Sequence, residues 1–320
     1  MLTPARIVGG QLDASPPIAP HGDNPPMAPS TAEIEAVLAR AWGILGPDLI
    51  PHDAGMNSRT WMVSAGADRY VAKAVPASEH ARFASGLAVA ALVESAGIPA
   101  GAAVPTLAGE PWIRLPGHTL AVLAFVRGTP LIGDDPAEQR RIGSTLAQAH
   151  RALIGRQVAG IARFHWIDPA VGHLGLLDWV RPAIVAALAE WERLPPDSLT
   201  WGLIHTDPAP EAFLRDADTG AIGLIDWDTG MLGPLMYDLA SAVMYIGGPE
   251  RAAPLVRAYL DHGPLDRAEV ERTMGPMLRM RWAVQADYFA RRVAANDLTG
   301  IRDPIENEKG LDDARRGLGR

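Results

Sequence analysis

Two short apolar segments that each lead into an aspartate constrain this chain more than any other feature. The first runs through Leu203 and Ile204 to Asp207, and the second runs from Ala221 to Asp226. Apolar runs of this length are typical of short buried strands, so we expect both aspartates on loops that follow strands. Carboxylates placed in this way suit phosphoryl transfer, in which one orients a substrate hydroxyl and one holds a metal on the phosphates. Paired aspartates also arise on loops by chance, so the surrounding sequence is needed to tell a functional pair from a coincidental one.

The composition excludes several classes of protein. The chain has 320 residues, of which 48% are hydrophobic and 21% are charged, which suits a globular protein of one large or two modest domains. A net charge of −8 opposes nucleic-acid binding, because that binding depends on clustered Lys and Arg. The absence of cysteine excludes disulfides and thiolate sites. Since no secretory signal and no membrane-length apolar stretch is found, we expect a cytoplasmic enzyme without a membrane partner.

The first part of the chain divides into a tail and a small lobe. Residues 1–29 hold seven prolines and are predicted to be a disordered tail, because such a segment buries too little apolar surface to offset its ordering entropy. Ser30 and Glu33 form a capping-box pattern that begins the folded part. The next segments are expected to be strands at 61–64 and 70–75, a helix at 79–96, and strands at 111–115 and 120–126.

The remainder of the chain is predicted to be mostly helical. Helices are expected at 136–154, at 176–193 and between about 234 and 297, with the two aspartate loops between them. The final residues, 315–320, are expected to fray. This organisation indicates an N-terminal lobe over 30–126 and a C-terminal lobe over 127–320.

The segment that holds the two aspartates resembles the catalytic loop of the aminoglycoside phosphotransferase and choline kinase family. That family's loop reads His-Gly-Asp-Leu-His-Pro-Gly-Asn and is followed by a strand and Ile-Asp-Trp or Ile-Asp-Phe. The positions that match in order and spacing are His205, Asp207, Pro210, Ile225, Asp226 and Trp227. The resemblance implies an α+β, protein-kinase-like bilobal fold, with a small β-rich lobe and a larger, mostly helical lobe.

The resemblance also implies roles for individual residues. Asp207 would be the catalytic residue that orients the acceptor hydroxyl, and Asp226 would bind Mg²⁺ on the β and γ phosphates. Lys73 would pair with the α and β phosphates, and Asn57 and Ser58 would belong to the loop that covers them.

Three further residues are expected to support the loop. In the family, the histidine at the position of His205 packs beneath the catalytic aspartate. Asp238 matches a buried carboxylate that caps the loop backbone, and Asp228 would face or support the same cleft. The later helical residues Trp282, Gln285, Asp287 and Tyr288 and the segment 306–308 are candidates for the acceptor pocket or for the core.

The sequence departs from the family pattern at Thr206, where the family has glycine, and at two positions that bear directly on the chemistry. Ala212 stands where the family has a metal-binding asparagine, and Gly86 stands near the position of the glutamate that usually pairs with the lysine. Three interpretations follow for the metal: Glu211 replaces the asparagine, one metal held by Asp226 and phosphates suffices, or catalysis is lost. Glu79, about two turns before Gly86, is the candidate that we name to replace this glutamate as the partner of Lys73.

The resulting functional hypothesis is an ATP-dependent phosphotransferase, with GTP as a possible donor, that acts on a hydroxyl of a small molecule. An aminoglycoside, an amino alcohol and a sugar-like compound all fit as acceptors. The alternative is a catalytically silent nucleotide- or metabolite-binding pseudokinase. A third hypothesis is nucleotidyl transfer on the same fold. The sequence does not indicate the oligomeric state.

Overall fold

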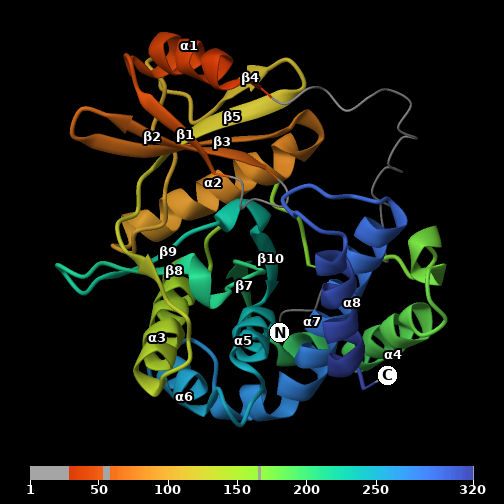
Figure 1. Cartoon of the computed structure of the whole chain (residues 1–320). Coiled ribbons are helices and arrows are strands. Elements are labelled where there is room, and N and C mark those ends of the chain that lie inside the picture. The colour runs from red at the N-terminus through yellow and green to blue at the C-terminus, as the bar shows by residue number, and fades with distance from the viewer. Residues whose placement is uncertain (1–28, 53–57, 165–166, 320) are drawn as a thin grey trace, which may run out of the picture.

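The computed structural model describes residues 29–52, 58–164 and 167–319 and contains two lobes. Figure 1 shows a small lobe built on a sheet above a larger lobe of helices and short strands. The predicted α+β bilobal fold is confirmed. The predicted tail, Pro29 excepted, lies outside the described residues, and so does Asn57.

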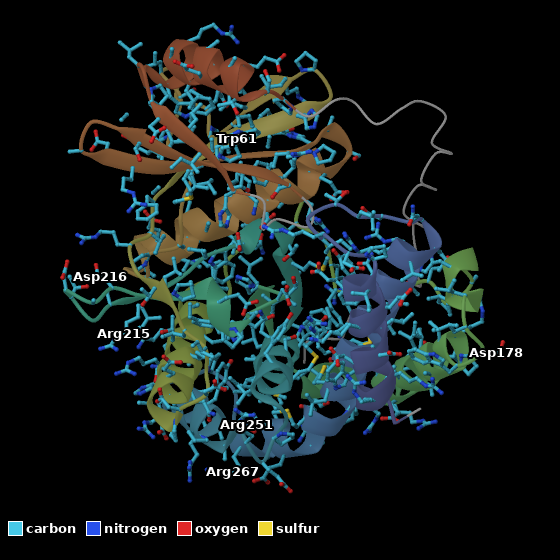
Figure 2. All side chains as sticks on the ribbon, in the orientation of Figure 1. Trp61, Asp178, Arg215, Asp216, Arg251 and Arg267 are labelled. Atoms are coloured by element: carbon cyan, nitrogen blue, oxygen red, sulfur yellow. The ribbon has the colours of Figure 1, made fainter. Side chains whose placement is uncertain are left out.

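The small lobe is a five-stranded antiparallel sheet with a helix on each face. The strand order is β1-β2-β3-β5-β4, and the strands are β1 (Asp48–His52), β2 (Arg59–Ala65), β3 (Asp68–Pro76), β4 (Ile113–Leu115) and β5 (His118–Ala124). Helix α1 (Thr31–Trp42) begins at the predicted capping box and buries Ile34 and Leu38 against Trp61 (Figure 2). Helix α2 (His80–Ser95) buries Phe83 and Leu87 against the opposite face.

The alternation of side chains along β3 directs Lys73 toward α2. Ala72 and Ala74 belong to the apolar cluster beneath α1, whereas Val75 belongs to the cluster with α2. Successive side chains of a strand point to opposite faces, so Lys73 shares the α2 face with Val75. The sheet register therefore turns this lysine toward the junction between the lobes.

The large lobe carries the two aspartate loops on short strands surrounded by helices. Its strands are β6 (Thr129–Pro130), β7 (Trp201–Ile204), β8 (Phe213–Arg215), β9 (Ile222–Leu224) and β10 (Met231–Pro234). Its helices are α3 (Pro136–Leu153), α4 (Val180–Glu192), α5 (Leu235–Ile246), α6 (Ala253–His262), α7 (Arg267–Ala294) and α8 (Ile305–Gly317). In Figure 2 the turn after β8, with Arg215 and Asp216, extends away from the body of the lobe.

Most predicted elements are present with small differences at their ends. The helix expected at 79–96 is α2, and the helix expected at 136–154 is α3. The expected frayed end is wrong in part, because α8 continues to Gly317, where an added Cβ atom would lie 2.2 Å from the Trp282 ring. None of the helices within the described residues is long and apolar enough to cross a membrane.

Candidate active site

Lys73 pairs with two carboxylates that follow β9. Its Nζ atom lies 3.2 Å from Asp226 Oδ1 and 3.1 Å from Asp228 Oδ2, and only 11% of the Lys73 side chain is exposed. Burial alone would lower the pKa of Lys73, but the two carboxylates outweigh burial and raise that pKa above its ordinary value. The lysine is therefore a fixed positive charge between the lobes.

The two carboxylates differ in their surroundings. The Asp226 side chain is 63% exposed, whereas that of Asp228 is 18% exposed. Burial works to raise the pKa of Asp228, but the Lys73 ammonium outweighs burial and holds the pKa below its ordinary value. Asp226 has a left-handed backbone, with φ 68°, and begins the 3-10 turn η5 (Trp227–Thr229). The open carboxylate is therefore available to a ligand, whereas the enclosed one is not.

The loop of Asp207 is built around the buried carboxylate of Asp238 on α5. The backbone N–H groups of His205 and Thr206 donate to Asp238 over 2.6 Å and 2.8 Å. His150 Nε2 lies 3.0 Å from the same carboxylate, and His150 Nδ1 lies 2.6 Å from the Tyr259 hydroxyl. Because these groups are buried, the network fixes the position of the loop backbone.

Thr206 occupies a position where the family commonly has glycine. Its φ of 77° is left-handed, a conformation that costs a non-glycine residue about 1–3 kcal/mol. The hydrogen bond from its N–H group to Asp238 and a 2.8 Å contact between the hydroxyls of Thr206 and Thr229 hold this conformation. The Thr229 contact also joins the Asp207 loop to η5.

His205 is a second link between the two aspartate loops. Its ring Nε2 lies 2.7 Å from the carbonyl oxygen of Ile225, the residue before Asp226. The ring also packs edge-on against Trp227, with 4.7 Å between centroids. The fully buried imidazole therefore connects the two loops from inside the large lobe.

The carboxylate of Asp207 is bound by two residues of distant helices. The Tyr245 hydroxyl on α5 donates a short hydrogen bond to Asp207 Oδ1, and Arg281 Nη2 on α7 donates to the same atom over 2.9 Å. Arg281 also donates to the Tyr245 oxygen over 2.8 Å. Burial, with the nearby carboxylate of Asp207, raises the pKa of Tyr245 above its ordinary value, so this hydroxyl keeps its proton. Our sequence interpretation missed both partners, because neither belongs to a local motif.

The segment around position 212 packs as part of the core. Ala212 is 5% exposed and ends the 3-10 turn η4 (Pro210–Ala212), and its carbonyl accepts a 2.9 Å hydrogen bond from Ile225. Glu211 is exposed, and its charge contributes to raising the pKa of Tyr245. Among the described residues no cluster of three His, Asp or Glu side chains forms a ready metal site. Ser58 belongs to the expected nucleotide loop; it is half-buried and lies just before β2.

Several candidates for the acceptor pocket instead join α7 to its neighbours. Asp287 Oδ1 lies 2.7 Å from His173 Nε2, and Gln285 donates to the Gly310 carbonyl over 3.0 Å. Arg292 donates to buried Asn307 over 2.9 Å. These polar side chains of α7 are therefore explained by their contacts with neighbouring elements. A role for them in binding an acceptor stays a prediction.

A comparison with known protein families finds a match over most of the chain. The model of a family described as "Phosphotransferase enzyme family" matches residues 48–271. No functionally curated protein matches the chain.

Three solved structures illustrate the shared fold. A microcompartment-associated aminopropanol kinase is 18% identical, with a TM-score of 0.67 over 90% of this chain and 95% of that one. An amicoumacin kinase in complex with AMP-PNP, Ca²⁺ and its substrate is 14% identical, with a TM-score of 0.70 over 90% and 92%. Choline kinase from Streptococcus pneumoniae is 13% identical, with a TM-score of 0.64 over 89% and 97%. At these identities the likeness establishes the fold.

Proposed function

This chain belongs to the phosphotransferase enzyme family, and we propose that it transfers the γ-phosphate of ATP to a hydroxyl of a small molecule. Aminoglycosides, amino alcohols and sugar-like compounds are the acceptor classes to test, and GTP is the second donor to test. The amicoumacin kinase structure holds AMP-PNP, which supports a nucleoside triphosphate as donor. We place the reaction in the cytoplasm.

The observation that carries this proposal is that Lys73, Asp226 and Asp207 are held on segments that buried side chains connect. Lys73 contacts Asp226 over 3.2 Å, and His205 connects the Asp226 segment to the loop of Asp207. In phosphoryl transfer, positioning and charge stabilisation dominate the rate, because the transition state is loose. Asp207 would orient the acceptor hydroxyl and accept its proton, and Lys73 would bind the α and β phosphates.

Magnesium fits the residues present at Asp226. Mg²⁺ is commonly held by one or two carboxylates, with substrate phosphates and water as the other ligands. The exposed Asp226 carboxylate meets this requirement by itself, and Glu211, the residue before Ala212, is the alternative to test as a second ligand. When bound, Mg²⁺ would neutralise charge on the β and γ phosphates. Ala212 offers no ligand, so the remaining positions would fall to phosphates and water.

A catalytically silent nucleotide-binding protein is the second candidate function. Two observations favour it: Ala212 occupies the position of the family's metal-binding asparagine, and the Asp207 carboxylate is held by Arg281. Such a protein would bind nucleotide through Lys73 without turning it over.

One assay separates the two functions. The protein is incubated with Mg²⁺, ATP and each acceptor class, ADP release is followed, and the product mass is measured. Asp207→Asn is the paired variant, because it removes the charge and keeps the shape. A kinase yields an acceptor heavier by one phosphoryl group in the wild type only. A product carrying a nucleotidyl group would instead indicate nucleotidyl transfer.

A binding protein is stabilised by nucleotide and yields no product with any acceptor. Nucleotide binding is followed by thermal unfolding with and without Mg²⁺-ATP, which does not depend on the acceptor. Protein that neither binds nucleotide nor turns it over contradicts both functions.

A further inference from the structure

We propose that Asp228 is the positioning residue of Lys73, replacing the glutamate that relatives carry on α2, and that Gly86 gives it the room to do so. The inference rests on the proposed function, because it assumes that Lys73 binds the nucleotide phosphates. It assigns to Asp228 a role in nucleotide affinity that is separate from metal binding by Asp226.

The carboxylates of α2 itself are engaged elsewhere. Glu79, just before the helix, pairs with Arg82 over 3.1 Å. Glu94, near its end, accepts the backbone N–H groups of Ala100 and Ala102 over 3.3 Å and 2.9 Å. Among the described residues, both ion pairs of Lys73 go to the segment after β9 and neither goes to α2.

Gly86 lies where α2 crosses η5, and it has no space for a side chain. A Cβ atom added at position 86 would lie 2.4 Å from the Trp227 carbonyl oxygen and 2.5 Å from Asp228 Cα. Both atoms belong to the backbone, so no rotamer change relieves the overlap. A glutamate at this position would therefore push α2 away from η5. Glycine instead lets the helix approach until the backbone of Asp228 lies directly against it.

The close approach places Asp228 between α2 and the sheet face that carries Lys73. Figure 1 shows α2 lying between the small-lobe sheet and the upper part of the large lobe. Asp228 Oδ2 reaches Lys73 Nζ over 3.1 Å from a site in which 18% of its side chain is exposed. The large lobe thereby supplies a carboxylate partner for a lysine of the small lobe.

The difference in side-chain exposure assigns different roles to Asp226 and Asp228. Asp226, with 63% of its side chain exposed, can turn to a metal, and its contact with Lys73 would then be lost. Asp228 is enclosed and stays with the lysine. A lysine that kept no carboxylate would lose its fixed direction, because a long flexible side chain is ordered only by its partners.

A double-mutant cycle on nucleotide affinity tests this assignment. Mg²⁺-ATP binding is measured for the wild type, Asp228→Asn, Lys73→Met and the double variant, with Asp228→Glu as the conservative change. Glu79→Gln is the matched control, since it removes a carboxylate just before the start of α2, one that pairs with Arg82 and not with Lys73. We expect Asp228→Asn to weaken binding about tenfold, Asp228→Glu to recover part of the loss, and Glu79→Gln to stay within twofold. In the Lys73→Met background, Asp228→Asn should cause no further loss.

Two results would overturn the proposal. One is wild-type affinity in Asp228→Asn. The other is an equal loss from Asp228→Asn with and without Lys73, which would indicate a metal ligand. A wild type that does not bind Mg²⁺-ATP would contradict the proposed function instead.

Urea unfolding of the nucleotide-free protein tests the pairing independently. Lys73→Met leaves the enclosed Asp228 carboxylate without its cation, so the double variant should be more stable than Lys73→Met alone. Adding Glu79→Gln to Lys73→Met should bring no such recovery. If Asp228→Asn destabilises the Lys73→Met protein as much as the wild type, the pairing is contradicted even where no nucleotide binds.

Discussion

The two aspartate loops are alike in their backbone and differ in what holds their carboxylates. Each loop follows a strand and contains a non-glycine residue with positive φ, Thr206 in one and Asp226 in the other. Asp226 contacts Lys73, a residue of the family's own pattern. Asp207 is instead held by Tyr245 and Arg281 from distant helices. Under the proposed function, the side expected to bind nucleotide therefore uses residues of the family pattern, whereas the carboxylate expected to face the acceptor is held by residues that only the tertiary fold brings together.

The largest effect is expected from the buried carboxylate beneath the Asp207 loop. Asp238→Ala removes the acceptor of two backbone N–H groups and the partner of His150, which should lower the free energy of unfolding by roughly 3 kcal/mol. Chemical denaturation measures this change. The control is Asp218→Ala, because the pair of Asp218 with Arg127 is exposed, and it should change stability by less than about 0.5 kcal/mol. Equal stability of the two variants would show that Asp238 does not hold the loop.

A smaller loss of stability is expected from Gly86→Ala. The added methyl group would overlap the backbone of Trp227 and Asp228, and relief by a shift of α2 should cost about 1–3 kcal/mol and weaken Mg²⁺-ATP binding. Gly172→Ala is the matched control, because a Cβ atom there meets nothing within 4 Å. Thermal unfolding and nucleotide titration measure both effects. If Gly86→Ala has the same stability and nucleotide affinity as the control, α2 and η5 can accommodate a methyl group, and the close approach is not required.

Variants on the two sides of the site should affect different kinetic constants. Tyr245→Phe removes a hydrogen bond to Asp207 without touching the nucleotide side, so kcat should fall about tenfold while KM for the nucleotide stays within twofold. Lys73→Met should raise KM for the nucleotide as well. Steady-state kinetics on the best acceptor provide both numbers. Similar changes of KM in both variants would argue that the two sides are not separate.

The smallest effect is expected from Glu211→Gln. Its carboxylate is exposed, and its charge acts on Tyr245, so the Mg²⁺ concentration for half-maximal activity should change less than threefold. The matched variant is Asp226→Asn, which should raise that concentration at least tenfold. A comparable increase in Glu211→Gln would identify Glu211 as the second metal ligand.

The sequence allowed the fold to be predicted and the motif segments to be located, because both rest on local patterns, whereas the pairing of Lys73 with Asp226 and Asp228 across the chain does not. Alternation along β3 and the capping box before α1 follow from neighbouring residues, and the Asp226 segment follows from its short spacing to Asp207. The contact of Arg281 with Asp207 joins residues 74 positions apart, and no periodicity encodes it. The same is true of Gly86, whose importance depends on which backbone it meets.

Phosphoryl transfer by Asp207→Asn, measured beside nucleotide binding, tests the central claim most directly. Transfer of labelled γ-phosphate from ATP to the acceptor is followed for the wild type and the variant, and Mg²⁺-ATP affinity is measured on the same samples. We predict that the variant binds Mg²⁺-ATP within threefold of the wild type and transfers phosphate at least a hundredfold more slowly. A variant that transfers phosphate at the wild-type rate would contradict the role of Asp207 and the division of the site into two sides.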